Sequence, residues 1–172
     1  GTCGELTVRL VHECHPTVDP EAYIRRVIEY VRDEVAKNLP VMEGAREILQ
    51  YFHEHGVRIA TASSTAVKLI EENLAKSGLR EYFDEVVGGD LVTNGKPAPD
   101  IFLLAAERIG VPPADCYVFE DGYNGLHGAA AAGCAPVMIP DTLPPTDEMR
   151  AICTGIYPSL RAALDAIRQG AL

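Results

Sequence analysis

The sequence predicts an α/β protein built on a doubly wound parallel sheet. From residue 45 onward, apolar segments of strand length alternate with amphipathic segments of helix length. Glycines follow several of the helical segments, at the position where a helix commonly ends. Such alternation indicates βαβ units, which join parallel strands through right-handed crossovers. With 172 residues, 47% of them apolar, the chain can form one such domain or one domain with a small appendage.

The segment before this alternation predicts a separate helical piece. Apolar residues recur at helical spacing between residues 19 and 38, and Pro20 suits the first turn of a helix. Because Leu39-Pro40-Val41 breaks the pattern, we expect a hinge there, with residues 1–39 on one side and residues 40–172 on the other. The apolar stripe of the helix consists of Ile24, Val27, Ile28, Val31 and Val35.

The α/β part contains elements whose order places the candidate site. We expect helices at 45–55, 65–77, 100–109, 124–132 and 159–169, and strands at 57–61, 85–88, 116–119 and 135–139. Ligands of doubly wound sheets bind beyond the carboxyl ends of the strands. The candidate functional residues are therefore those that follow Ala60, Val87, Phe119 and Ile139.

Charge and composition exclude several classes of partner. The formal net charge of −10 argues against nucleic acid and against an anionic membrane surface. The weakly polar run 128–140 is too short to span a membrane, and the first residues do not resemble a signal peptide. The five cysteines are odd in number and form no CxxC, which favours reduced thiols in a cytoplasmic protein over zinc, including a clip of His12, Cys14 and His15.

The first predicted strand is followed by a cluster of hydroxyl side chains, Thr61-Ala62-Ser63-Ser64-Thr65. Hydroxyls and free backbone N–H groups at the start of a helix can hold an anion such as phosphate. The alternative interpretation is a plain helix N-cap, which any Ser or Thr can provide.

The second predicted strand is followed by a loop that carries Lys96. The loop is not a Walker phosphate-binding loop, because the glycine spacing differs and Pro97 follows the lysine. Asn94-Gly95 predicts a tight turn, and Pro97 restricts the other side of Lys96. We therefore interpret Lys96 as a fixed cation, with a flexible surface lysine as the alternative.

The third predicted strand is followed by two adjacent carboxylates, Glu120 and Asp121. Like charges at the end of an apolar strand favour a bound cation, and hard oxygen ligands favour Mg²⁺. The alternative is an acidic first turn of the next helix. The glycines that follow run GxxGxxG rather than GxGxxG, so we do not predict a bound dinucleotide.

Hydroxyl donors, a fixed lysine and a metal-binding carboxylate pair together suit phosphoryl transfer. At this point the sequence resembles the haloacid dehalogenase-like (HAD) superfamily, specifically its β-phosphoglucomutase-like phosphatases. The resemblance rests on Gly95-Lys96-Pro97-Ala98-Pro99-Asp100-Ile101-Phe102, on Val118-Phe119-Glu120-Asp121-Gly122-Tyr123-Asn124-Gly125 and on Ala132-Gly133. It implies a HAD-like Rossmannoid core at residues 40–172 and the remnant of a mobile helical cap at residues 1–39.

The resemblance also implies roles for individual residues. Thr61 would donate a hydrogen bond to the transferring phosphoryl group, assisted by the amide of Ala62, and Lys96 would neutralise that group. Asp121 would ligate Mg²⁺ directly, and Glu120 would ligate or support the ion. The implied function is Mg²⁺-dependent hydrolysis of small phosphate monoesters, such as phosphorylated sugar metabolites, through an aspartyl-phosphate.

One part of the family pattern is not found in this sequence. No DxDG motif, which would supply the nucleophilic Asp on the central strand, precedes Pro40. We therefore expect this chain alone to be inactive, and the strands near Thr61 and Phe119 to flank a gap. A preceding segment or a second chain would fill the gap; the alternative is that the two strands pair directly.

Two other functions stay open from the sequence. A sugar phosphomutase is one, although Gly4 falls where the mutase cap loop would carry an arginine, which favours a phosphatase. The other is a non-catalytic binding or structural module.

Overall fold

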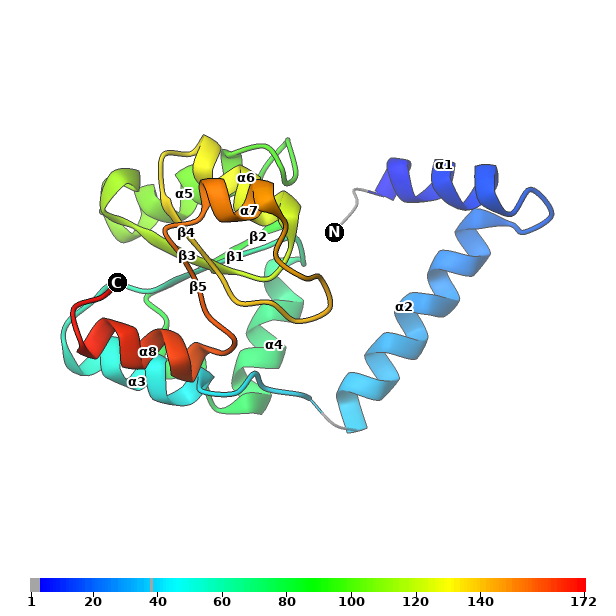
Figure 1. Cartoon of the computed structure of the whole chain (residues 1–172). Helices are drawn as coiled ribbons and strands as arrows, with labels where there is room; N and C mark the ends of the chain where they lie inside the picture. The colour runs from blue at the N-terminus through cyan, green and yellow to red at the C-terminus, as the bar shows by residue number, and fades with distance from the viewer. Residues whose placement is uncertain (1–3, 38) are drawn as a thin grey trace. The chain divides into compact units, whose positions relative to one another are not determined.

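The computed structural model describes residues 4–37 and 39–172, which divide into two compact units, Gly1–Pro40 and Val41–Leu172. The first unit consists of α1 (Gly4–Cys14) and α2 (Pro20–Lys37), which pack against each other (Figure 1). Asp19 caps α2, because its Oδ1 accepts hydrogen bonds from the backbone N–H groups of Glu21 and Ala22. The sequence predicted α2 closely but did not predict α1.

The apolar stripe of α2 is largely exposed in the described structure. The side chains of Val27, Ile28 and Val31 are 42%, 61% and 51% exposed, and Ile24 and Val35 are half-buried. None of the five is buried against α1 within the part of the chain that the structure describes.

The second unit alternates strands and helices. Its strands are β1 (Ala60–Ser63), β2 (Glu85–Gly88), β3 (Tyr117–Glu120), β4 (Ala135–Met138) and β5 (Gly155–Ile156). Its helices are α3 (Ala45–Glu54), α4 (Val67–Ser77), α5 (Asp100–Ile109), α6 (Tyr123–Ala131), α7 (Asp147–Ile152) and α8 (Leu160–Arg168). The bounds of β2 and α5 are those predicted, whereas α7 and β5 were not predicted.

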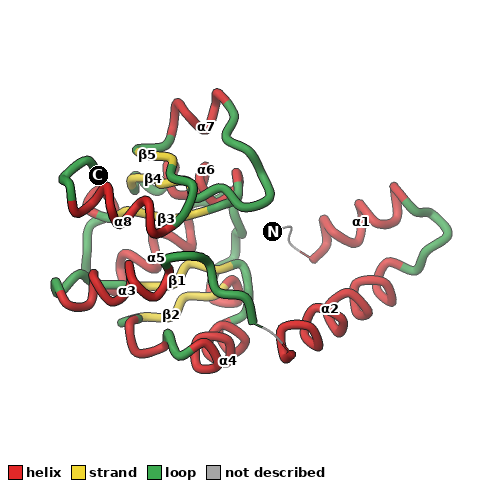
Figure 2. Tube along the Cα trace, turned by 60° about the horizontal axis from the view of Figure 1, so that its bottom comes forward, coloured by secondary structure: helices red, strands yellow, loops and turns green. Residues whose placement is uncertain are grey.

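The strands form two parallel ladders, β1–β2 and β3–β4–β5 (Figure 2). Thr61 pairs with Val86 in the first ladder, and Phe119 pairs with Val137 in the second. Within residues 4–37 and 39–172, no ladder joins β1 to β3. The alternative of direct pairing between the two strands is therefore wrong for this structure.

The strands β1 and β3, which form the neighbouring edges of the two ladders (Figure 2), are less buried than β2 and β4. All four residues of β1 are half-buried, and β3 has one exposed and three half-buried residues. In contrast, three of the four residues in each of β2 and β4 are buried. Central strands of a doubly wound sheet are normally the most buried, so the burial runs opposite to the usual order.

The first strand lies later in the chain than predicted. Val57 is 47% exposed and its N–H donates to Phe52 at the end of α3, so it does not join the ladder. Pairing begins only at Ala60, opposite Glu85. As a result, Thr61, Ala62 and Ser63 lie within β1 instead of after it.

Helices cover both faces of the strands, as the doubly wound prediction requires. In β4, Val137 packs with Ile48 of α3 and Leu164 of α8, whereas the adjacent Met138 packs with Leu126 and Met149 on the α6–α7 side. Besides these two apolar clusters on either side of β4, a third cluster joins α5 and α6 to β2. It contains Val87, Ile101, Phe102, Ala105, Ala129 and Cys134. No helix within residues 4–37 and 39–172 has the length and apolar character to span a membrane.

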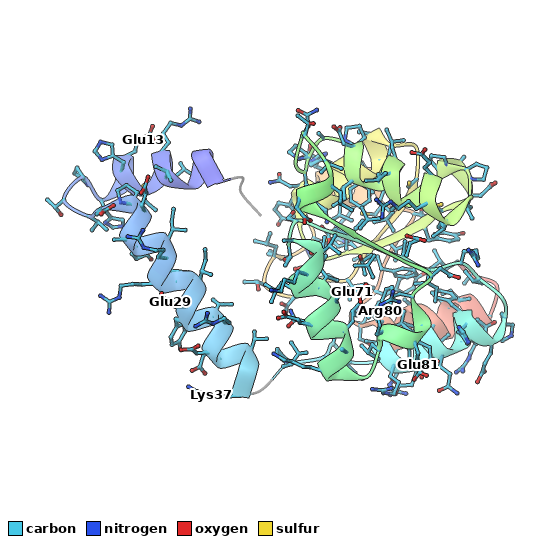
Figure 3. All side chains as sticks on the ribbon, turned by 180° about the vertical axis from the view of Figure 1, so that it is seen from behind. Glu13, Glu29, Lys37, Glu71, Arg80 and Glu81 are labelled. Carbon is cyan, nitrogen blue, oxygen red and sulfur yellow. The ribbon has the colours of Figure 1, made fainter. Side chains whose placement is uncertain are left out.

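An ion pair on the surface joins the middle of α4 to the turn that leads into β2. Nε of Arg80 donates to Oε2 of Glu71 at 2.6 Å (Figure 3). Nη1 of Arg80 donates to the carbonyl of Phe83. Gly78, which ends α4, has a φ of +64°, a conformation that favours glycine. The sequence predicted this stop.

Candidate active site

Lys96 is held in place by two contacts. Its Nζ donates a hydrogen bond to Oε1 of Glu120 at 2.9 Å and lies 5.0 Å from the ring centroid of Phe102. The side chains of Lys96 and Glu120 are only 11% and 17% exposed. Lys96 is therefore not a flexible surface lysine, and the loop after β2 meets the end of β3 through this ion pair.

The loop around Lys96 has its own internal bonds. The amide of Asn94 donates to Oδ1 of Asp100 at 2.8 Å, and the N–H of Ala98 donates to the carbonyl of Gly95 at 3.1 Å. The Lys96–Pro97 peptide is cis. Asp100 is the first residue of α5, and its carboxylate binds this loop and does not cap the helix.

Both carboxylate oxygens of Glu120 have partners. Oε1 accepts from Lys96, and Oε2 accepts from the backbone N–H of Asp121 at 3.2 Å. The side chain of Asp121 is exposed and has no hydrogen-bond or ion-pair partner among the described residues. Asp121 is thus the carboxylate of the two that is available to a metal ion, while Glu120 holds Lys96.

The Asp121 carboxylate fits Mg²⁺ as one ligand of an ion that also needs water and substrate oxygens. Mg²⁺ commonly takes one or two carboxylates and completes its octahedron with water and substrate phosphate oxygens. Asp121 can provide such a carboxylate. No group of three or more His, Cys, Asp or Glu side chains suited to a metal ion is found in residues 4–37 and 39–172, so those residues contain no cage made of protein ligands alone.

Within β1, the hydroxyl of Thr61 is hydrogen-bonded to the neighbouring strand β2. It donates to the carbonyl of Val87 at 3.1 Å and accepts from the N–H of Val87 at 2.9 Å. Ser63 Oγ accepts from the N–H of Thr65. For Thr61 to donate to a phosphoryl group, its hydroxyl would have to leave the Val87 carbonyl.

The start of α4 does not match the N-cap interpretation of the hydroxyl cluster. The N-cap is Ala66, which has no side-chain cap, so the Ser and Thr residues are not the N-cap. Oδ1 of Asp90 accepts from the N–H of Val67 at 2.9 Å and so occupies one of the free donors at the helix start. Asp90 was not among the residues predicted from the sequence. It lies just after β2, and residues that follow strands were the candidates for the site.

Three of the described thiols, those of Cys116, Cys134 and Cys153, are poorly suited to act as nucleophiles at neutral pH. Burial raises the pKa of Cys116 and of Cys153, and it raises the pKa of Cys134 to about 11. Each of these cysteines is a neutral thiol at pH 7, and the thiolate is the reactive form.

Comparison with known proteins agrees with this fold. The model of the haloacid dehalogenase-like hydrolase family matches residues 5–133, three quarters of the chain. The chain belongs to the haloacid dehalogenase-like hydrolases. This confirms the family expected from the motifs around Lys96 and Glu120 and the α/β class with parallel strands.

The curated relatives include phosphatases. A probable pseudouridine-5'-phosphatase of Drosophila melanogaster is 42% identical over 125 residues, which cover 66% of this chain and 54% of that protein. The fructose-1-phosphate phosphatase of Escherichia coli is 40% identical over 116 residues, covering 67% of this chain and 61% of the relative. The chain thus spans about half to three fifths of the length of these relatives.

Solved structures share the architecture. A Thermotoga maritima protein assigned as a β-phosphoglucomutase superposes with a TM-score of 0.79 at 28% identity, covering 98% of this chain and 79% of that one. A HAD hydrolase of Entamoeba histolytica superposes with a TM-score of 0.78 at 25% identity, covering 91% and 74%.

Proposed function

We propose that this protein takes part in the Mg²⁺-dependent hydrolysis of small phosphate monoesters, such as sugar phosphates, through an aspartyl-phosphate. The observation that carries the proposal is the largely buried Lys96–Glu120 pair, next to the exposed Asp121 at the carboxyl end of β3. The relatives' names, which include phosphatases of a nucleotide and of a sugar phosphate, support this class of substrate.

Each residue has a distinct role in this proposal. Lys96 places a positive charge where negative charge gathers during phosphoryl transfer, and its pairing with Glu120 fixes that charge in advance. Asp121 would hold Mg²⁺, which, when bound, neutralises phosphate oxygens. Thr61, together with the backbone N–H groups of Ala62 and Ser63, would bind the phosphoryl oxygens from the side of β1.

We propose further that a parallel strand lies between β1 and β3 and carries the nucleophilic aspartate. Both strands have an edge without a ladder partner in the described structure, and both are less buried than β2 and β4. Unpaired strand edges accept another strand readily. The strand would come from a preceding segment or from a second chain, and residues 1–39 would be part of a helical cap.

Complementation tests this proposal directly. The chain is mixed with a synthetic peptide of four or five apolar residues followed by DxDG, and the release of p-nitrophenol from p-nitrophenyl phosphate is measured. We expect no turnover by the chain alone, and Mg²⁺-dependent turnover with the peptide. A peptide with Asn in place of the first Asp is the matched control, and Lys96→Met and Asp121→Asn chains should be inactive with either peptide.

Two outcomes would contradict the proposal. Turnover by the chain alone that survives Lys96→Met would place the chemistry elsewhere. Tight binding of the DxDG peptide without turnover would favour a non-catalytic module. A requirement for a sugar bisphosphate activator would instead favour a phosphomutase, a function that the Thermotoga maritima neighbour makes worth testing.

A cytoplasmic location stays a prediction from the pattern of cysteines.

A further inference from the structure

The three glycines of the GxxGxxG pattern, Gly122, Gly125 and Gly128, are not equivalent. A Cβ at Gly122 would meet only Oε1 of Glu120, at an ordinary 3.9 Å. A Cβ at Gly125 would overlap Oε1, Cδ and Cγ of Glu120. A Cβ at Gly128 would lie 2.9 Å from Cε2 of Phe102 and 3.2 Å from the carbonyl oxygens of Pro97 and Ala98.

Space, and not backbone conformation, explains the glycine at 125. The residue lies inside α6, is buried, and is not among the glycines with positive φ. An alanine would therefore suit the helix itself and is the better helix former. What an alanine would displace is the side chain of Glu120, which lies folded against the first turn of α6.

The two inner glycines contact the two partners of Lys96. Gly125 adjoins Glu120, which accepts the hydrogen bond from Nζ of Lys96, and Gly128 adjoins Phe102, whose ring lies 5.0 Å from Nζ. Because they are three residues apart on one helix, they share a face. Two glycines of the GxxGxxG pattern therefore contact the residues that hold Lys96. The same pattern led us not to predict a dinucleotide site.

We infer that Gly125 is a positioning residue for Lys96, acting through Glu120. Its missing side chain lets the Glu120 carboxylate lie between α6 and the loop after β2, where it fixes the ammonium group. The importance of this position for phosphoryl transfer rests on the proposed function, but the positioning itself does not. Gly128 differs in kind, because a side chain there would press on backbone carbonyls as well as on a ring.

A change in stability with opposite signs in two backgrounds tests the inference. With Glu120 present, Gly125→Ala should destabilise the protein, because the new Cβ and the carboxylate compete for one volume. In the Glu120→Ala background that volume is empty, so Gly125→Ala should stabilise the protein, raising the folding equilibrium constant about fivefold through helix propensity. Equal effects in both backgrounds would overturn the inference.

The reactivity of Lys96 gives a second readout that general loosening would not move. Reductive methylation is followed by peptide mass spectrometry, with the exposed Lys68 and Lys76 as internal references. In Gly125→Ala, Lys96 should react several-fold faster than in the unchanged chain, because its ammonium group loses the carboxylate that holds it. Gly122→Ala is the matched control and should leave the Lys96 rate unchanged.

These measurements use neither phosphate nor turnover, so failure of the proposed function would leave them interpretable. An unchanged Lys96 rate in Gly125→Ala would overturn the positioning role even if the complemented chain proved to be a phosphatase.

Discussion

Replacing Lys96 with methionine removes the ammonium group and keeps a side chain of similar length. The Glu120 carboxylate then loses its hydrogen bond at 2.9 Å and keeps only the N–H of Asp121 at 3.2 Å. Because the Glu120 side chain is 17% exposed, water cannot fully replace the lost partner. The variant therefore leaves a charge that is poorly solvated in the folded state.

The size of the effect follows from the burial of the pair. Breaking a fully buried ion pair costs about 3–5 kcal/mol, whereas exposed pairs contribute about 0–1 kcal/mol. The Lys96–Glu120 pair lies between these limits, and the carboxylate can turn partly toward solvent. We expect Lys96→Met to lower the free energy of unfolding by about 2 kcal/mol, near the middle of the range.

Urea unfolding followed by far-UV circular dichroism measures this quantity; the chain contains no tryptophan to serve as a fluorescence probe. Lys68→Met, on the exposed face of α4, is the matched control and should change stability by less than about 0.5 kcal/mol. The double variant Lys96→Met/Glu120→Gln should recover most of the loss, because no unpaired charge remains. The reasoning is refuted if Lys96→Met equals the control, or if the double variant is as unstable as the single one.

Three further predictions concern the fold around the site. Leu126→Ala, at a fully buried position of α6, should cost about 3 kcal/mol in urea unfolding, against less than about 1 kcal/mol for Leu103→Ala, where the residue is 43% exposed. Thr61→Val keeps the shape but removes two hydrogen bonds to β2, and should cost about 1–2 kcal/mol by the same measurement. Burial raises the pKa of Cys134 from about 9 to about 11, so the folded state holds this proton more tightly than the unfolded state. Its contribution to stability should be complete below pH 9 and lost as the pH rises through 11, which a comparison with Cys134→Ala across this range would detect.

The elements with local signals were predicted well. Gly78 and Gly110 end α4 and α5 in the left-handed conformation, and this conformational requirement can be read from sequence. The start of β1 could not be predicted, because it depends on pairing with Glu85, twenty-five residues away. The short β5 has only two residues and no hydrophobic pattern of its own, so nothing local distinguished it from a loop.

The sequence predicted which residues form the candidate site better than it predicted their contacts. Lys96, Glu120 and Asp121 were all chosen because they follow strands, and the structure places Lys96 and Glu120 in contact. Their pairing was not predicted, since it depends on how closely α6 approaches the loop after β2. Nor was Asp90 predicted to bind the start of α4, because a spacing of 23 residues carries no local pattern.

The separation of the two ladders has a consequence for how the protein opens. No backbone hydrogen bond joins β1–β2 to β3–β4–β5 in the described residues; side chains of α5 and α6 connect them. Each ladder can therefore open without breaking the backbone hydrogen bonds of the other, and amide hydrogen exchange should report two cooperative units. Thr61 belongs to one unit and Asp121 follows the other, so a ligand bound to both would slow exchange in both ladders at once.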